Sequence, residues 1–419
     1  MTSYIGRTLA AASSLLAMAM SLPALANESA VVGALQPNNL EPRADNGRQV
    51  YEASQFARFA PQTALDMVSQ IPGFQISQVS ADRGLGEANQ NVLVNGQRIT
   101  GKSNDARTAL SRVPVSSVIR LEVADGATFN VAGLVGQVLN VVTKADAPQG
   151  NFAWRPSFQS HIEPNWLNAE VNLSGKLGKG DFTLGINNNA AYRLAGRGND
   201  VIRDRNGNLL AVREQLVQRQ VDQPRIAGTY SSTSSGGSIF NANAALEFFE
   251  SRLNRPYEVD AVGQPDFREL RTSREDEWNF ELGADYEFGL GGGRLKLIGF
   301  QRFEHSPFSN FYRRESGTGA PATGQRFDQT IDEGESVARA EYRWKSGKAD
   351  WQISAEAAYN FLDSEASLFQ LNGQGGLDPV AVPNATSRVE EKRGQLLLSY
   401  GRPLSPSLSL QSTIGGEYS

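Results

Sequence analysis

The sequence has no cysteine and only two histidines. Without cysteine the chain forms no disulfide bond and no thiolate metal site. His161 and His305 lie far apart and in no metal-ligand spacing. After residue 26 the sequence also has no apolar run of the length that a transmembrane helix needs, about 18 residues. Within a membrane, therefore, only a closed β-barrel would satisfy the backbone of this chain.

The sequence also lacks the short motifs of common catalytic sites. It contains no G-x-S-x-G nucleophile motif and no P-loop. The stretch 289–293 (GLGGG) stands between two predicted strands and opens no helix, which is typical of a hairpin turn. We therefore expect no enzyme activity, no cofactor and no bound metal.

The charge balance argues against a nucleic-acid partner. The formal net charge is −5 and no block of basic residues occurs. Of the 40 basic residues 8 are lysines, so 32 are arginines. Rigid guanidinium groups suit ion pairs with carboxylates in a polar interior better than lysines do.

The N-terminus has the pattern of a secretory signal peptide. Arg7 precedes an apolar run, and Ala24 and Ala26 form an A-x-A cleavage site. We expect cleavage after Ala26, so that 1–26 is removed on export. The alternative is a membrane anchor, for which the apolar run is short. Residues 27–48 are polar, contain two prolines and are predicted to form a flexible tail.

Residues 49–148 have the pattern of a small α+β domain. Apolar residues from Ala64 to Ile71 follow helical spacing, and Pro72-Gly73 then stops the helix. NVLVNGQRI is a strand that runs into an Asn95-Gly96 hairpin turn. A short helix before Pro114 and two apolar strands complete the predicted domain.

Residues 149–419 are predicted to form antiparallel strands with one apolar face. In WNFELGADYEF (278–288), Trp278, Leu282 and Tyr286 alternate with polar or small residues, three of which are carboxylates. In a soluble sandwich such an apolar face is a core. In an outer-membrane barrel it faces lipid, and the acidic face lines the lumen.

The predicted connections alternate in length. About eleven strands are joined by short turns on one side, and polar segments on the other side are predicted to be long loops. These segments are 194–213, 251–273, 305–333 and 363–386. Aromatic residues near strand ends, such as Trp344, Trp351 and Tyr400, are typical of the belts at lipid headgroups. This asymmetry favours an outer-membrane barrel.

Four motifs of residues 49–148 resemble the plug domain of TonB-dependent outer-membrane receptors. They are TALDMVSQIPGFQI, RGLGEANQNVLVNGQRI, VPVSSVIRLEVADGATF and GQVLNVVTK, in the family's order. The resemblance implies a transmembrane antiparallel β-barrel of 22 strands with an α+β plug. Residues 149–419 would supply about the first half of it. Because open edges are costly in lipid, we expect the chain to be a piece of a longer protein, or else a defective product.

The resemblance implies energised import of a scarce or large substrate into the periplasm. The expected partners are a TonB-type energy-transducing protein, outer-membrane lipid and an imported small molecule or oligosaccharide. The expected location is the outer membrane of a Gram-negative cell. The alternatives are a passive porin-like channel and a soluble exported β-sandwich binding protein. Siderophores, cobalamin and saccharides all stay open as substrates.

Specific residues carry these expectations. The plug-motif residues are Arg83, Gly84, Gly86, Asn95, Gly96, Arg98 and Glu122. The candidate TonB-contact segment contains Glu28, Ala30, Val31 and Val32, with a plain linker as the alternative. Charges of the first domain (Asp82, Arg83, Arg98 and Glu122) are hypothesised to pair with Glu281, Asp285 and Glu287 of the barrel wall.

One predicted loop has a composition that suits ligand binding. It contains the candidate substrate-binding residues Phe308, Phe311, Tyr312, Arg313 and Arg314. Aromatic rings and arginines together bind anionic or aromatic ligands by stacking and bidentate hydrogen bonds. The alternative is a solvated loop whose aromatic residues pack on its neighbours.

Overall fold

A computed structural model describes residues 40–77, 91–98, 106–129, 134, 136–144, 148–158, 164–405 and 408–419. Leu40–Ser419 belong to one compact unit. Within the described residues, every helix is too short or too polar to span a bilayer. The predicted signal peptide, the candidate TonB-contact segment and Arg83, Gly84 and Gly86 lie outside the described residues.

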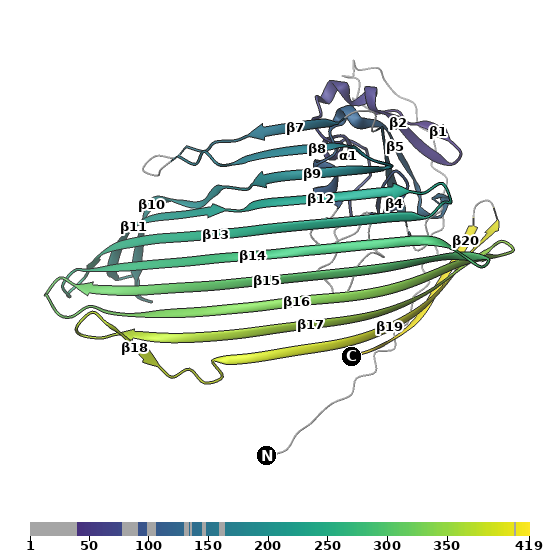
Figure 1. The fold of residues 1–419 in the computed structure, drawn as a ribbon. Coiled ribbons are helices and arrows are strands. Elements are labelled where there is room, and N and C mark those ends of the chain that lie inside the picture. Colours follow the sequence, from purple (N-terminus) through teal and green to yellow (C-terminus); the bar gives the residue numbers. More distant parts are fainter. Residues whose placement is uncertain are drawn as a thin grey trace. The chain divides into compact units, whose positions relative to one another are not determined.

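The N-terminal domain is built on a six-stranded sheet with the order β1-β2-β5-β6-β3-β4 (Figure 1). Most neighbours are antiparallel, but β3 and β6 pair in parallel. The strands are β1 (Arg43–Asp45), β2 (Arg48–Glu52), β3 (Val92–Val94), β4 (Gln97–Arg98), β5 (Val118–Asp125) and β6 (Gln137–Thr143). The helices are η1 (Ala53–Phe59), α1 (Ala64–Val68), α2 (Ala106–Ser111), η3 (Val115–Ser117) and η4 (Gly126–Thr128).

The helices and the sheet enclose an apolar core. The domain contains the mixture of helices and strands that the sequence predicts for 49–148. Helix α1 begins where Thr63 and Asp66 form a reciprocal capping box, which satisfies backbone N–H groups at the first turn. Its Met67 packs in a buried cluster with Phe56, Leu110 and Leu121. Burying these large side chains is the main driving force for folding this domain.

Part of the predicted tail 27–48 is folded. Strands β1 and β2 form a hairpin around Asn46-Gly47, whose φ angles are 48° and 80°. Asparagine and glycine adopt positive φ readily, so this pair closes a tight turn. The sequence pattern does not predict this hairpin, because β1 has only three residues and all of them are exposed.

The remaining strands form one open antiparallel sheet (Figure 1). Eleven strands of the described residues form its continuous path, in the order β20-β19-β17-β16-β15-β14-β13-β12-β9-β8-β7. With the strands off this path the sheet has fourteen strands among the described residues, more than the about eleven predicted, whereas the predicted combination of an α+β domain and an antiparallel sheet is confirmed. The bounds are β7 (Gln149–Trp154), β8 (Ala169–Leu177), β9 (Gly180–Asn188), β12 (Pro224–Thr233), β13 (Ile239–Ala261), β14 (Phe267–Leu290), β15 (Gly293–Ser316), β16 (Thr323–Ser346), β17 (Ala349–Leu371), β19 (Thr386–Ser405) and β20 (Leu408–Tyr418).

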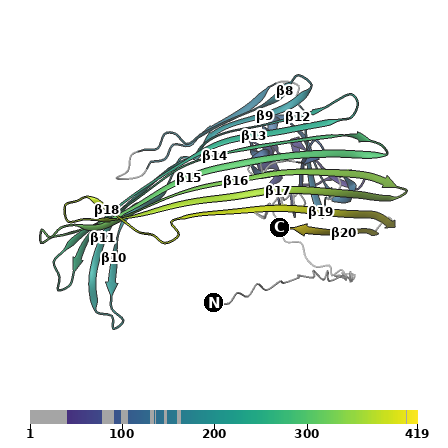
Figure 2. The same cartoon turned by 60° about the horizontal axis from the view of Figure 1, so that its bottom comes forward.

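Three further strands extend this path at one end of the sheet. They are β10 (Ala191–Arg203), β11 (Leu209–Asp222) and β18 (Leu377–Val380). Strand β13 pairs with β12 through Glu247 and with β11 from Glu250 onward. The β10–β11 hairpin therefore continues the ladder beyond the ends of β9 and β12, and it lies at the same end of the sheet as β18 (Figure 2).

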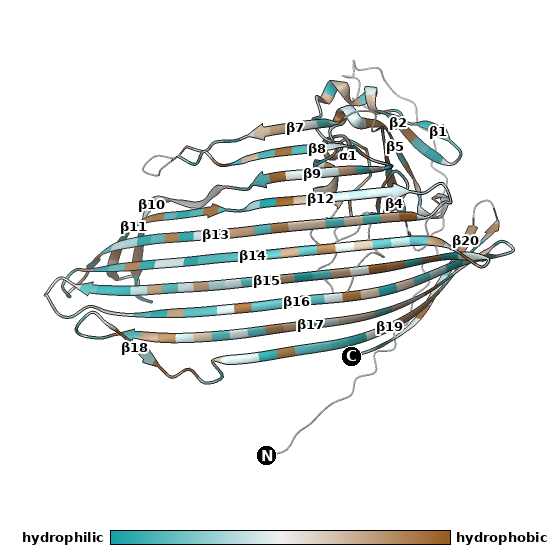
Figure 3. Cartoon of the chain, viewed as in Figure 1, coloured by the Kyte–Doolittle hydropathy of each residue, from teal (hydrophilic) through white to brown (hydrophobic). Residues whose placement is uncertain are grey.

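The prediction of long loops is wrong for most of their length. Strands β14, β15 and β16 each have 24 residues, so each is ~80 Å long. Most of 194–213 belongs to the β10–β11 hairpin, and most of 251–273 and 305–333 belongs to the ladders of β13–β16. Segment 363–386 contains the end of β17, strand β18 and the first residue of β19. Figure 3 shows that hydrophilic residues dominate the ends of β14–β16 nearest β10. Apart from a small buried cluster of Ala211, Tyr257 and Val259, polar residues dominate there, and backbone pairing with cross-strand charge pairs holds the strands without a continuous apolar face.

The two faces of β14 have the reverse of the burial found in soluble proteins. Glu281 and Asp285 are each 2% exposed. On the opposite face, Leu282 is 51% and Tyr286 45% exposed. Soluble proteins rarely bury carboxylates or expose contiguous apolar surface. The apolar face is therefore not packed on a second sheet, and a soluble sandwich is excluded for these strands.

Two rows of aromatic rings border this apolar face. One row, near the short turns, includes Trp344, Trp351 and Tyr400, with successive ring centroids 6.1 and 4.8 Å apart. The other row includes Phe303 and Phe361, whose centroids are 6.4 Å apart. Trp351 and Phe361 are ten residues apart on β17, which corresponds to ~34 Å along the strand. With a strand tilt of about 40°, the rows enclose a band close to the ~25 Å apolar height of a membrane barrel.

Candidate functional site

A buried carboxylate joins three strands of the N-terminal domain and, through Asn140, the turn between β3 and β4. Glu122 is 4% exposed and lies at the centre of β5. Its oxygens accept hydrogen bonds from Arg48 Nη1 at 2.9 Å, Arg120 Nε at 2.7 Å and Asn140 Nδ2 at 3.1 Å. Asn140 Oδ1 accepts from the backbone N–H of Gly96 at 2.8 Å. The network therefore fixes the β3–β4 hairpin against β6, β5 and β2.

The predicted Asn95-Gly96 turn is confirmed. The two residues have φ angles of 52° and 76°, the positive values that a tight hairpin requires. Asn95 also bonds Thr143, because its Oδ1 accepts from the backbone N–H and its Nδ2 donates to Oγ1, both at 2.9 Å. The motif residues Asn95, Gly96 and Glu122 thus meet at one place, whereas the side chain of Arg98 lies outside the described residues.

Sequence reasoning missed Asn140 and Arg48, which complete this network. Asn140 is the one polar residue inside VLNVV, an otherwise apolar run of β6. A buried amide in such a strand must find hydrogen-bond partners, and that requirement is the signal that would have identified it.

The surroundings of Glu122 favour its charged form. Burial pushes the pKa of this carboxyl up, but the hydrogen bonds from Asn140 and Arg120 and the charges of Arg120 and Arg48 outweigh burial. The pKa of Glu122 therefore lies below its ordinary value.

Glu122 predicts a loss of stability in acid. A carboxyl whose pKa is lower in the folded state stabilises the fold fully above its unfolded pKa, about 4.3. That contribution is lost as pH falls through the lower, folded pKa. We expect wild type and Glu122→Gln to converge in stability as pH falls from about 6 to about 2. Thermal unfolding followed by near-ultraviolet circular dichroism would measure this. A difference in stability between wild type and Glu122→Gln that stays constant over this pH range contradicts the prediction.

Charged residues also form networks along the buried face of the large sheet. Asp285 lies 3.6 Å from Lys296 Nζ. Glu287 pairs with Arg294 and also with Arg343, whose Nη2 lies 2.6 Å from Glu287 Oε1. These five side chains come from β14, β15 and β16 and cross-link the three strands on their polar face. The excess of arginine in the sequence serves such pairs.

The hypothesis that charges of the N-terminal domain pair with Glu281, Asp285 and Glu287 stays a prediction. Glu122 pairs within its own sheet. The partners of Asp285 and Glu287 belong to neighbouring strands of the large sheet. Outside the described residues lie Asp82, Arg83 and the side chain of Arg98.

The N-terminal domain matches a known protein family. Residues 43–134 match the family described as the TonB-dependent Receptor Plug Domain. The match covers the β1–β2 hairpin, the Asn95-Gly96 turn and Glu122. Residues 43–134 are a TonB-dependent receptor plug domain.

Solved structures similar to the chain include three uptake proteins. The ferric yersiniabactin uptake receptor FyuA from Yersinia pestis is 12% identical, with a TM-score of 0.30 over 88% of this chain. The unliganded ferric citrate transporter FecA is 13% identical, with a TM-score of 0.30 over 88% of this chain. The copper transporter OprC is 11% identical, with a TM-score of 0.33 over 89% of this chain. The chain matches 64%, 62% and 63% of their respective lengths. No curated protein matches it.

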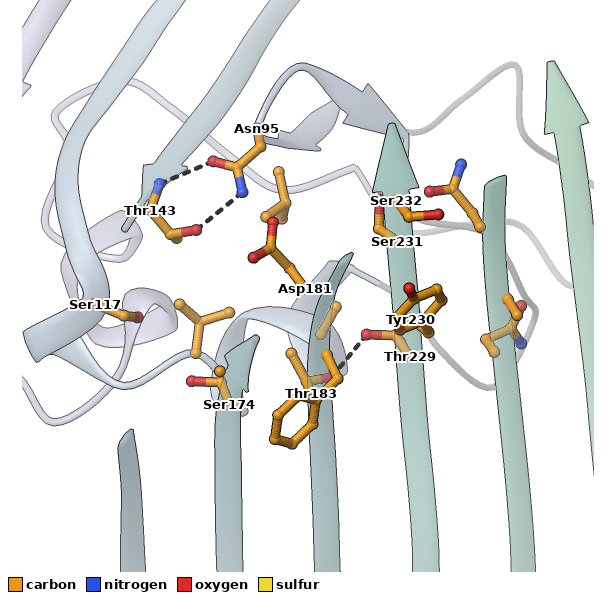
Figure 4. A pocket seen from close by; sticks show the side chains of 18 of the residues that line it. Asn95, Ser117, Thr143, Ser174, Asp181, Thr183, Thr229, Tyr230, Ser231 and Ser232 are labelled. Atoms are coloured by element: carbon orange, nitrogen blue, oxygen red, sulfur yellow. Dashed lines mark hydrogen bonds between the residues drawn. The ribbon is translucent and has the colours of Figure 1, made fainter. Parts of the chain in front are cut away.

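A cavity of about 430 Å³ is lined by residues of the plug domain and of the large sheet (Figure 4). Asn95, Thr143 and Ser117 line it from the plug domain, and Thr183 and Thr229 line it from β9 and β12. The two threonine hydroxyls are hydrogen-bonded to each other at 2.8 Å. Hydroxyl and amide groups of this kind bind water and hydroxylated molecules.

The candidate substrate-binding residues do not lie on a loop. All five belong to β15, and their side chains alternate between the two faces of the sheet. Phe308, Tyr312 and Arg314 share the face of the buried carboxylates, since they pair with odd-numbered residues of β14. Phe311 and Arg313 lie on the opposite face. The structure therefore brings three of the five together and separates the other two from them.

Proposed function

We propose that the chain is part of an outer-membrane receptor that imports a scarce or large substrate into the periplasm, with energy from a TonB-type protein. One observation carries the proposal. A plug domain is followed in the same chain by strands whose carboxylates are buried and whose leucines and aromatic residues are exposed. Lipid covers exposed apolar rows of this kind, and an aqueous lumen solvates the polar face.

The alternatives differ from this proposal in what they require of the plug domain. A passive porin needs no plug, because free diffusion is its function. A soluble binding protein would bury Leu282 and Tyr286, both of which are exposed. An enzyme is not proposed, because the networks around Glu122 and Glu287 are fully paired ion clusters within sheets. In the proposed receptor, 1–26 are removed on export, 27–48 include the tail, 49–148 form the plug and 149–419 form barrel wall.

The TonB-type partner is proposed to bind the segment around Val31. An extended segment adds to a strand of its partner through backbone hydrogen bonds, and this mode gives affinity without a folded epitope. Glu28, Ala30, Val31 and Val32 are the proposed contacts. Arg83, Gly84, Gly86 and Arg98 are proposed to support the plug movement that follows.

Single introduced cysteines test the proposal directly, because the sequence contains none. Val31→Cys in the intact protein is expected to form a disulfide with a cysteine placed in the strand-forming end of the TonB-type partner in cells. The matched control Leu282→Cys is expected to form none and to react instead with a lipid-soluble maleimide. Equal cross-linking at both positions, or release of the intact protein from membranes by alkaline carbonate, refutes the proposal.

A further inference from the structure

Three arginines converge on one buried tyrosine on the polar face of the sheet. Tyr257 of β13 is 3% exposed. The guanidinium carbons of Arg213, Arg255 and Arg271 lie 5.1, 5.4 and 5.6 Å from the centre of its ring. Arg271 also lies 5.5 Å from the ring centre of Tyr312. We call Arg213, Arg255, Arg271 and Tyr257 the arginine cluster.

The cluster lies on the face that the proposed function assigns to the lumen. Glu269 and Arg271 are odd-numbered residues of β14, as are the buried Glu281, Asp285 and Glu287, and the pairing of β14 with β13 has no bulge. The cluster belongs to the strand ends nearest the β10–β11 hairpin, far from the short turns. On this face the partner of the cluster would be a solute of the lumen and not a lipid headgroup.

The arginine cluster has more N–H donors than the neighbouring residues have acceptor atoms for them. Nε and Nη2 of Arg255 donate to one atom, Gln215 Oε1, at 2.9 and 2.6 Å. Arg213 lies 3.8 Å from Glu269, too far for a hydrogen bond, and its buried Nε has no partner among the described residues. A guanidinium carries five N–H donors. Within the part of the chain that the structure describes, Arg213 Nε thus has no acceptor, and two nitrogens of Arg255 share a single acceptor atom.

The charge of the cluster is positive even when nearby acids are included. Glu269 Oε1 accepts from Tyr312 Oη at 2.8 Å, whereas its Oε2 has no hydrogen-bond partner among the described residues and lies 3.8 Å from Arg213 Nη2. Asp200 lies one hydrogen bond further away, since it accepts from Gln215 Nε2 at 3.0 Å. Arg314 adds a fourth guanidinium on the same face. Four positive charges thus face two negative ones.

The geometry points to a binding site for a ligand that carries at least two negative charges, as carboxylates or phosphates, and this inference rests on the proposed function. Guanidinium pairs bind the oxygens of such groups in bidentate fashion. The rings of Tyr257 and Tyr312 hold the guanidinium planes in place, so less side-chain entropy is lost on binding. Glu269 opposes an arriving anion by charge repulsion and therefore limits affinity.

Titration calorimetry on the intact, detergent-solubilised protein tests the site. The probes are pyrophosphate and tricarballylate, with acetate as a singly charged comparison. We expect both polyanions to bind and acetate not to bind. Arg213→Gln and Arg271→Gln are each expected to weaken polyanion binding about tenfold or more, because each removes charged hydrogen bonds.

Two further variants separate a binding role from a merely structural one. Glu269→Gln is expected to strengthen polyanion binding, because it removes the nearer of the two carboxylates that face the cluster. Arg268→Gln is the matched control, since Arg268 lies on the opposite face of β14 and pairs with Glu258 at 2.9 Å. It is expected to leave binding unchanged. Weaker binding in Glu269→Gln, or equal losses in the Arg268 and Arg271 variants, refutes the site.

This experiment is independent of the energy-transducing partner. One outcome is that polyanions bind in a way that depends on Arg213 and Arg271, while the protein does not cross-link at Val31. This outcome would support the binding site and overturn the transport proposal. Cross-linking at Val31 together with the same weak binding in wild type and both arginine variants would overturn the site alone.

Discussion

Glu122→Gln is expected to lower the opening free energy of strands β5 and β6 in the plug by about 2–3 kcal/mol above pH 6. Glutamine keeps the shape of the side chain but removes the charge that binds Arg48 and Arg120. Those arginines are partly exposed, so water compensates part of the loss. Native-state hydrogen exchange of the β5 and β6 amides in the intact protein measures the opening free energy.

The matched control is Asp45→Asn. Asp45 also belongs to the plug domain and pairs with an arginine, but its ion pair with Arg43 is 3.7 Å long and exposed. Exposed pairs contribute little, so a change below about 0.5 kcal/mol is expected. If both variants shift the exchange of β5 and β6 equally, burial of Glu122 is not what makes its network stabilising.

Leu282→Arg is expected to destabilise the membrane-inserted protein by about 2–4 kcal/mol. Leu282 lies on the exposed apolar face of β14, midway between Trp278, whose ring contacts Phe303, and Tyr286, whose ring stacks on Phe288. Under the proposed function this position faces the centre of the bilayer, where a guanidinium is most costly. Urea titration of the intact protein folded in phospholipid vesicles, followed by tryptophan fluorescence, measures the change.

Leu270→Arg is the control on the same strand and face. Leu270 lies beyond the aromatic row of Trp278, toward the end of β14 where hydrophilic residues dominate (Figure 3). Outside the hydrocarbon region the same substitution is expected to cost no more than about 1 kcal/mol. A penalty at Leu270 that equals the one at Leu282 would show that the apolar face of β14 does not contact lipid.

The sequence by itself predicted the features that depend on local chemistry. Alternation in WNFELGADYEF separates Leu282 from Glu281 whatever the partner strand, because side chains of a strand alternate. Asn95-Gly96 closes its hairpin because these two residues tolerate positive φ. The plug motifs are likewise recognised from the order of residues along the chain alone.

The tertiary structure alone decided which residues meet across strands. The ladders of β13–β17 continue through polar segments because backbone pairing there needs no apolar face, so composition alone suggested loops. Arg48, Glu122 and Asn140 meet only because β2, β5 and β6 are neighbours. Arg213 and Arg271 likewise reach one tyrosine only through the register of β11, β13 and β14. Register is a pairing between distant segments, and no local pattern encodes it where both faces are polar.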